Sequence, residues 1–170
     1  MRATPAVIDE LRSTLKSRSD PRLAEATRRY FPTDIRALGV GNAEVRRIAD
    51  ALVKQRGLSP EDCLAVTEDL LAQATHHEEV LLGFAMVRKA VGRAFDESLL
   101  DRFRYWLEHT DVQKSVGWLL KVAADHHREA VVGFIQENIS RMQRDTLRYA
   151  IERLAPEQRK ALLALKPKMP

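Results

Sequence analysis

The chain has 170 residues, 45% of them hydrophobic and 31% charged, a balance typical of one soluble domain whose core is stable without disulfides. The N-terminal stretch MRATPAVIDELRS lacks the apolar segment of a signal peptide, and no run approaches the roughly 18 apolar residues of a membrane span, so we expect neither export nor a membrane partner. The net charge is +4, with 12 lysines and arginines against 7 acids in residues 1–56, 5 against 10 in residues 57–110, and 11 against 7 in residues 111–170.

Helix start and stop signals recur along the chain, whereas alternating strand patterns and tight hairpin turns are nearly absent. Thr4-Pro5 and Asp20-Pro21 each place a capping side chain before a proline, which favours the first position of a helix. Asn42 is expected to cap the next helix, which Gly57 ends. The tetrapeptide SPED, residues 59–62, predicts a capping box that starts another helix.

Six more helices are expected in the rest of the chain. They cover residues 76–91, the segment from a cap at Asp96 to His109, the segment after a cap at Asp111, and residues 127–139, 144–154 and 156–165. Helices with such short connections pack against their neighbours, and helix pairs recur about every 35–40 residues, as in HEAT-like solenoids. The sequence therefore predicts an all-α superhelix, a HEAT-like repeat solenoid, in a single domain over residues 1–170.

Metal and cofactor sites find little support in the sequence. His76-His77 and His126-His127 are adjacent pairs, which point about 100° apart on a helix and do not chelate as residues four apart do. The segment Gly39–Asn42 lacks the preceding strand and the Lys-Ser/Thr pair of a phosphate-binding loop. We therefore expect no metal and no cofactor.

Three other features are interpreted as packing. Cys63, the single cysteine, lies among apolar neighbours and is expected to be a buried thiol in a reducing compartment. Trp106 shares an apolar stripe with Leu99 and Phe103 and is expected in the core. Residues 30–32 (YFP), at the end of the second helix, are expected to serve core and loop packing.

The segment QKSVGWLLK, residues 113–121, places one tryptophan apart from its apolar stripe, which is formed by Val112, Val116, Leu119, Leu120 and Ala123. At about 100° per residue, Trp118 points to the same sector as Lys114 and Lys121. Such a surface suits a nucleic acid, with the lysines for phosphates and the ring against a sugar or a base. Cover by another helix of the solenoid is the alternative, and periodicity alone does not separate the two.

The same segment carries a family resemblance. QKSVGWLLK, followed by VVGFIQENI and LRYAIERL, resembles the C-terminal signature of the AlkD-type DNA alkylation repair family. Upstream, YFPTDIRALGVGNAEVRRIADAL and HHEEVLLGFAMVRKAV are similar to earlier family segments, and the resemblance spans residues 21 to about 155. It implies a HEAT-like repeat DNA glycosylase that removes bulky or cationic N-alkylated purines from double-stranded DNA.

Site residues follow from the resemblance where the motif matches. Trp118 corresponds to a family tryptophan that lines the DNA-facing cleft. Lys121, where the family has arginine, corresponds to a basic residue that contacts the backbone near the lesion. Arg148 matches a basic position in the last repeat, and Lys114 beside Trp118 completes the expected DNA-binding set.

One part of the family pattern is lacking. After a helix like RFRYWLEHT, family members carry a tryptophan, the critical aspartate four residues on, and about two further repeats, whereas this chain passes from Thr110 directly into Asp111. Asp111 is a candidate for the replacement carboxylate and also the expected helix cap. The carboxylate stabilises positive charge on the sugar as the base leaves, so DNA binding is expected to survive and base release to be weak or absent.

Two functions from different classes are therefore compared. The first is a DNA-binding repair protein, nucleoid-associated in the cytoplasm, with a homodimer as one way to rebuild the lost repeats. The second is a helical-repeat scaffold that binds another protein. Two basic chain ends on one surface would grip a polyanion, whereas scatter over solvated helix faces is what charge counting alone favours. Binding to DNA weakens steeply with salt, and binding to a protein through apolar helix faces does not.

Overall fold

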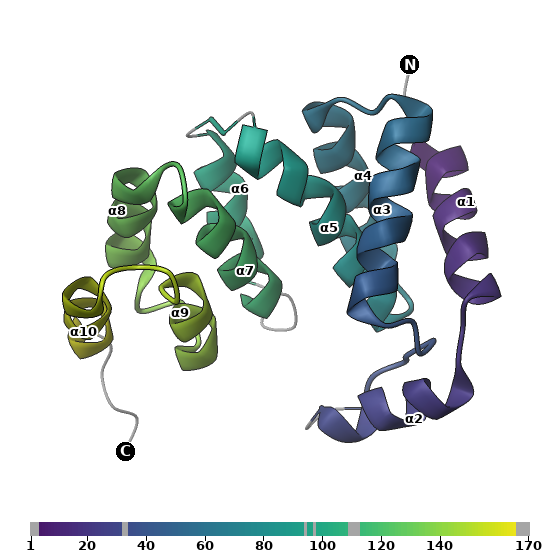
Figure 1. Ribbon diagram of the computed structural model, residues 1–170, viewed down its shortest axis with the longest axis horizontal. Coiled ribbons are helices and arrows are strands. Elements are labelled where there is room, and N and C mark those ends of the chain that lie inside the picture. The colour runs from purple at the N-terminus through teal and green to yellow at the C-terminus, as the bar shows by residue number, and fades with distance from the viewer. Residues whose placement is uncertain (1–3, 32–33, 94, 97, 109–112, 166–170) are drawn as a thin grey trace. The chain divides into compact units, whose positions relative to one another are not determined.

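The computed structural model describes residues 4–31, 34–93, 95–96, 98–108 and 113–165. Within these residues all regular structure is helical, in ten helices, and no strand is formed (Figure 1). The predicted all-α class is confirmed. The chain divides into two compact units, residues 1–90 and 91–170, each with its own set of buried side chains. A single domain over residues 1–170 stays a prediction.

The first unit contains four helices and most of a fifth: α1 (Thr4–Ser17), α2 (Pro21–Tyr30), α3 (Asn42–Arg56), α4 (Pro60–Gln73) and α5 (His77–Arg93). Helix α1 packs against α3 and α4. It contributes four apolar side chains to a core shared with α3, α4 and α5, namely Val7, Ile8, Leu11 and Leu15. Cys63 lies in this core with 3% of its surface exposed, as predicted.

Local sequence signals set several helix ends in this unit. The Asp20 carboxylate accepts hydrogen bonds from two backbone N–H groups in the first turn of α2. Ser59 and Asp62 form the predicted capping box at the start of α4. Gly57 ends α3 with a φ of 61°, in the left-handed region that favours glycine.

Two expectations for the first unit are wrong. Gly41 is the N-cap of α3, and Asn42 is already helical. The preceding loop enters the helix early because it is fixed at Gly39, which has a φ of 81° and where a Cβ would lie 2.0 Å from the Asp20 carbonyl oxygen. Tyr30 is 75% exposed instead of lying in the core, because α2 buries a different side, at Ala24; its ring meets Phe31 edge-on at 5.7 Å.

The second unit contains five helices: α6 (Ser98–Trp106), α7 (Gln113–Ala124), α8 (Arg128–Asn138), α9 (Arg144–Ala150) and α10 (Pro156–Leu165). Helix α7 packs against α6, α8 and α9, and α10 packs against α8 (Figure 1). Trp106 is fully buried, which confirms its predicted place in the core. The expected cap at Asp111 lies outside the described residues.

The start of α7 is tied to the turn before α9 by one buried side chain. The Gln113 amide is 3% exposed and donates to the carbonyl oxygens of Leu107 at 2.7 Å and Arg141 at 3.0 Å. Its carbonyl accepts from the Gln143 backbone N–H at 2.7 Å. A buried amide with these partners costs little desolvation and fixes the direction in which α7 leaves the loop.

Helix α9 is shorter than the pattern predicts. It ends at Ala150, whereas the sequence suggested a helix to Leu154. Ile151 and Leu154 are buried, and the turn between them is closed by a hydrogen bond from the Leu154 backbone N–H to the Ile151 carbonyl. The apolar positions that extended the predicted helix therefore anchor a turn.

Candidate nucleic-acid interface

Trp118 lies on the side of α7 that is not fully covered. The buried residues of the helix include Val116, Leu119, Leu120 and Ala123, all members of the predicted stripe, whereas Trp118 is half-buried. Lys114, one turn before it, is exposed. Helical spacing predicts that Trp118 is partly exposed, as it is in the structure. Its role in DNA contact stays a prediction.

Gly117, next to Trp118, is the point at which α7 approaches α9. A Cβ at this position would lie 2.7 Å from the Thr146 carbonyl oxygen and 3.3 Å from the Tyr149 Cβ. The backbones of the two helices therefore come close because the side chain is missing. This approach sets Tyr149, which is 47% exposed, beside the α7 surface.

Lys121 is held by groups from the end of α9. Its Nζ donates to Glu152 Oε2 at 2.9 Å and lies 4.7 Å from the centroid of the Tyr149 ring. The lysine side chain is only 12% exposed, whereas the Glu152 side chain is 55% exposed. The hydrogen bond from Lys121 lowers the pKa of the Glu152 carboxyl below its ordinary value, so this group is ionised at neutral pH.

Arg148 is much more exposed than Lys121. Its side chain is 62% exposed, and its Nη1 lies 3.8 Å from Asp145 Oδ1, a loose pair within α9. Arg144, one turn earlier, is exposed as well and was not singled out from the sequence.

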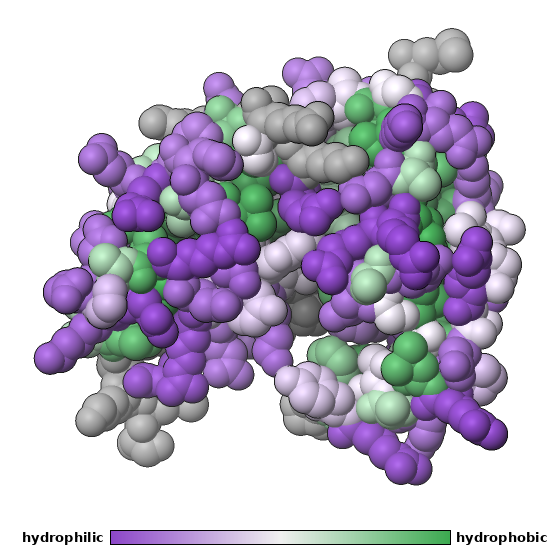
Figure 2. All heavy atoms as spheres, in the orientation of Figure 1, coloured by the Kyte–Doolittle hydropathy of each residue, from purple (hydrophilic) through white to green (hydrophobic). Residues whose placement is uncertain are grey.

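We call the surface formed by Lys114, Trp118, Lys121, Arg148 and Tyr149 the α7–α9 surface. All five residues lie in the second unit, on two helices that pack against each other. In the view of Figure 2, hydrophilic side chains dominate the part of the molecule that contains α7 to α10. The arrangement offers cations and two aromatic rings together, which suits phosphates and bases.

A second exposed aromatic lies in the first unit, at the end of α2. Tyr30 follows Arg28 and Arg29, both of which pair with Glu25 at 2.8 and 3.1 Å. The sequence interpretation assigned residues 30–32 to core and loop packing, but Tyr30 is 75% exposed.

The paired acids of HHEEV are structural in this protein. Glu78 is 1% exposed and accepts backbone N–H groups from Leu38 at 3.0 Å, Gly39 at 2.8 Å and Val40 at 3.3 Å. Glu78 therefore clamps the loop before α3 to the start of α5. No local sequence pattern indicates this clamp, because its partners lie about forty positions away.

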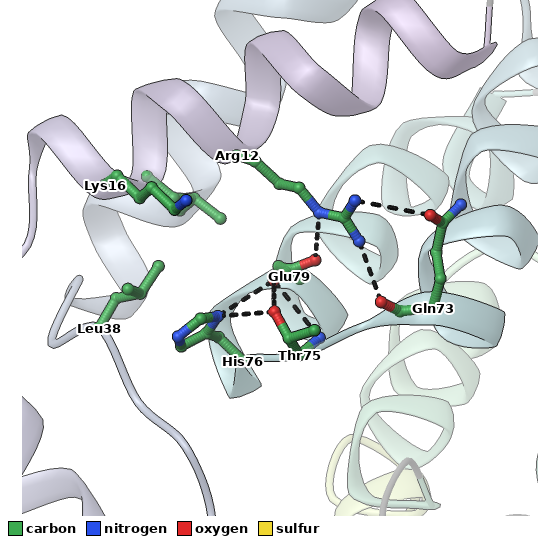
Figure 3. A pocket seen from close by; sticks show the side chains of 8 residues that line it. Arg12, Lys16, Leu38, Gln73, Thr75, His76 and Glu79 are labelled. Atoms are coloured by element: carbon green, nitrogen blue, oxygen red, sulfur yellow. Dashed lines mark hydrogen bonds and ion pairs between the residues drawn. The ribbon is translucent and has the colours of Figure 1, made fainter.

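Glu79 lies in the wall of a cavity of about 310 Å³ that is lined by Arg12, Leu15, Lys16, Leu38, Gln73, Thr75, His76 and Glu79. Its carboxylate is 2% exposed and accepts from Arg12 Nε at 2.9 Å and Thr75 Oγ1 at 2.9 Å, while His76 Nδ1 lies 3.2 Å away (Figure 3). Burial alone would raise the pKa of Glu79, but these hydrogen bonds lower it below its ordinary value. Arg12 and Glu79 thus neutralise each other and join α1 to α5.

No metal site is formed by histidine, cysteine, aspartate or glutamate within the described part of the chain. His77 packs edge-on against Phe31, with 4.7 Å between ring centroids, and burial lowers the pKa of its imidazole. His127 stacks on Phe95 at 4.2 Å. One histidine of each pair, His77 and His127, therefore contributes aromatic packing. Among the described helices, none has the length and apolar character needed to cross a membrane.

Comparison with known proteins identifies a family. The family model described as DNA alkylation repair enzyme matches residues 11–111 and 108–154, two stretches that overlap at residues 108–111. Comparisons with curated proteins and with solved structures gave no match. The family match covers most of the chain, including α7 and α9 with every residue of the α7–α9 surface. The chain therefore belongs to the DNA alkylation repair enzyme family.

Proposed function

We propose that the protein acts in DNA repair by binding double-stranded DNA through the α7–α9 surface, with little or no release of alkylated purines. The observation that carries the proposal is the half-buried Trp118 on a helix that also presents Lys114. Fully burying an indole is worth about 2–3 kcal/mol, and part of that gain is forgone here. A bound base or sugar would restore the lost contact.

Charge supports DNA over a protein partner. The segment that contains the α7–α9 surface, residues 111–170, holds 11 lysines and arginines against 7 acids. Arg148 and Lys114 are exposed, so both are accessible to backbone phosphates. Cations on such a surface position the duplex, and the aromatic rings are the groups that would contact a base.

The test is the affinity of the purified protein for a labelled duplex as a function of salt. Each phosphate contact changes log K by about 0.9 per log unit of salt. Lys114→Gln is therefore expected to weaken binding and to lower this slope by about 0.9. Lys160→Gln, which removes an equally exposed lysine from α10, is the matched control and is expected to leave the slope unchanged.

Fluorescence places Trp118 independently. In a Trp106→Phe variant, Trp118 is the single tryptophan, and we expect its emission to be quenched by acrylamide and altered by DNA. Trp106 is fully buried, so circular dichroism must first show a folded variant. The difference between the wild type and Trp118→Phe gives the same information without a core substitution. An indole that is shielded and insensitive to DNA contradicts the proposal.

A helical-repeat scaffold is the outcome that replaces this proposal if DNA does not bind. In that case neither Lys114→Gln nor added salt would alter the binding of the protein to its partner much. Weak base release is the second half of the proposal. Its support is the missing Trp–Asp stretch between Thr110 and Asp111, together with the break in the family match at residues 108–111.

A further inference from the structure

Lys121 is engaged within the protein. Its Nζ is 2.9 Å from Glu152 Oε2, and its side chain is 12% exposed between that carboxylate and the Tyr149 ring. Glu152 takes one of the three N–H donors of the ammonium group, and with 12% of the side chain exposed little of that group is left accessible to a phosphate oxygen. The proposed DNA contact and the internal ion pair therefore exclude each other to a large extent.

Glu152 is placed to act on an incoming phosphate directly. It lies in the turn after α9, with 55% of its side chain exposed, so its free surface faces solvent at the edge of the α7–α9 surface. Arg153 and Arg159 add to the positive field at this carboxylate, and its pKa lies below the ordinary value. An ionised carboxylate at this point repels a polyanion and holds the nearest lysine.

Tyr149 provides the second contact. The Lys121 ammonium lies over its ring at 4.7 Å, in the geometry of a cation–π interaction. This attraction is to the ring face as a whole and not to one acceptor atom. Lys121 can thus turn from the carboxylate to a phosphate and keep the ring beneath it, so Tyr149 acts as a positioning residue in both states.

We propose that Glu152 competes with DNA phosphate for Lys121 and thereby sets the affinity of the α7–α9 surface. The inference rests on the proposed function, since it needs DNA to bind at this surface. Removing the carboxylate would free Lys121 and add about one phosphate contact. One such contact changes affinity by up to about eightfold between 1 M and 0.1 M salt.

The experiment is a double-mutant cycle on binding to a fluorescein-labelled, undamaged duplex, with salt varied from low to high. Glu152→Gln is expected to tighten binding roughly three- to eightfold at low salt and to steepen the salt slope by about 0.9. In a Lys121→Gln background, Glu152→Gln is expected to have much less effect. Glu137→Gln, which removes an exposed carboxylate from α8 instead, is the matched control for general charge and should change the slope little.

The outcomes separate this inference from the proposed function. If the wild type binds DNA and Glu152→Gln does not tighten binding, the competition is wrong and the DNA-binding proposal stands. An equal gain with and without Lys121 also overturns it, because the effect is then general electrostatics. If Glu152→Gln weakens binding, Glu152 positions Lys121 instead of restraining it. If neither protein binds DNA at low salt, both proposals fail together.

Discussion

Gly117 decides how closely α7 and α9 pack. A Cβ at this residue would lie 2.7 Å from the Thr146 carbonyl oxygen, which belongs to the backbone and cannot move alone. We expect Gly117→Ala to destabilise the protein by about 1–3 kcal/mol, although alanine is the better helix former. Gly133, inside α8, is the matched control, because a Cβ there meets nothing within 4 Å.

Urea unfolding midpoints measure the difference. Gly133→Ala is expected to stabilise the protein by up to about 1 kcal/mol through helix propensity. Gly117→Ala should also weaken DNA binding, since the α7–α9 surface is displaced. Stabilisation by both alanines would show that α7 and α9 are free to separate and that the close approach at Gly117 has no structural role.

The pair formed by the half-buried Arg12 and the buried Glu79 predicts a specific dependence of stability on pH. The folded-state pKa of Glu79 is below its ordinary value, so the unfolded chain takes up this proton first as the pH falls. The stabilisation is therefore complete above the ordinary glutamate pKa of about 4.3 and is lost as the pH falls further, through the folded-state pKa.

We expect Glu79→Gln to destabilise the protein at pH 7 and to lose this deficit as the pH falls below about 4. Thermal unfolding of the variant and the wild type across the acid range measures the effect. Glu61→Gln, an exposed carboxylate in α4, is the control and should run parallel to the wild type. A deficit of Glu79→Gln that is constant over the whole acid range contradicts the assignment.

At the scale of elements, Glu78 determines the path between α2 and α3. Its buried carboxylate accepts three backbone N–H groups, from Leu38, Gly39 and Val40. In Glu78→Gln the carboxamide keeps a single acceptor oxygen. Its NH₂ group would face backbone N–H groups of the loop, which are also donors. We expect a loss of about 2–3 kcal/mol, since hydrogen bonds to a buried charged group are worth more than neutral ones.

Amide hydrogen exchange locates the effect of Glu78→Gln. The amides of residues 38–40 are expected to exchange faster than those of α4, because the loop loses its acceptor before the helices unfold. Ser59→Ala, which removes the capping box of α4, is the control. In this variant the amides of α4 are expected to exchange faster than those of residues 38–40. Uniformly faster exchange in Glu78→Gln would mean that the clamp acts on the whole unit.

Elements with local signals were predictable, and contacts between distant segments were not. The caps at Asp20 and Ser59 follow from a few neighbouring residues, and the structure has them where the pattern places them. The start of α3 was misplaced by one residue because the loop before it is fixed by Glu78, about forty positions further on. Helical spacing sufficed to predict that Trp118 leaves the apolar stripe.

The candidate site shows the same division. Helical periodicity predicts that Lys121 points to the same side of the helix as Trp118. It does not predict the partner Glu152, which lies 31 positions away in a turn that the pattern assigned to a helix. The exposure of Tyr30 was missed for a related reason. Whether an aromatic at a helix end is covered depends on which side α2 turns to the protein, and that is set by packing.

At the scale of the whole molecule, DNA binding is expected to be retained while base release is weak or absent. The groups proposed to hold DNA lie in α7 and α9, whereas the resemblance to the family predicts that the aspartate-bearing stretch is lacking between Thr110 and Asp111. Groups that hold the duplex act in the ground state and the transition state alike, whereas the carboxylate acts mainly as the base leaves. A protein with the first and without the second would bind DNA and turn over slowly.

The prediction is that the purified protein binds a duplex with methylated purines but releases the bases about 10²–10³ times more slowly than a family member that keeps the aspartate. Measuring released base and bound duplex in the same samples gives both quantities. Efficient release would refute the prediction. If Asp111→Asn then abolished base release but kept DNA binding, Asp111 would be identified as the replacement carboxylate. Release that persists in Asp111→Asn would require an acid from elsewhere, and a dependence of the rate on the square of protein concentration would point to a second chain.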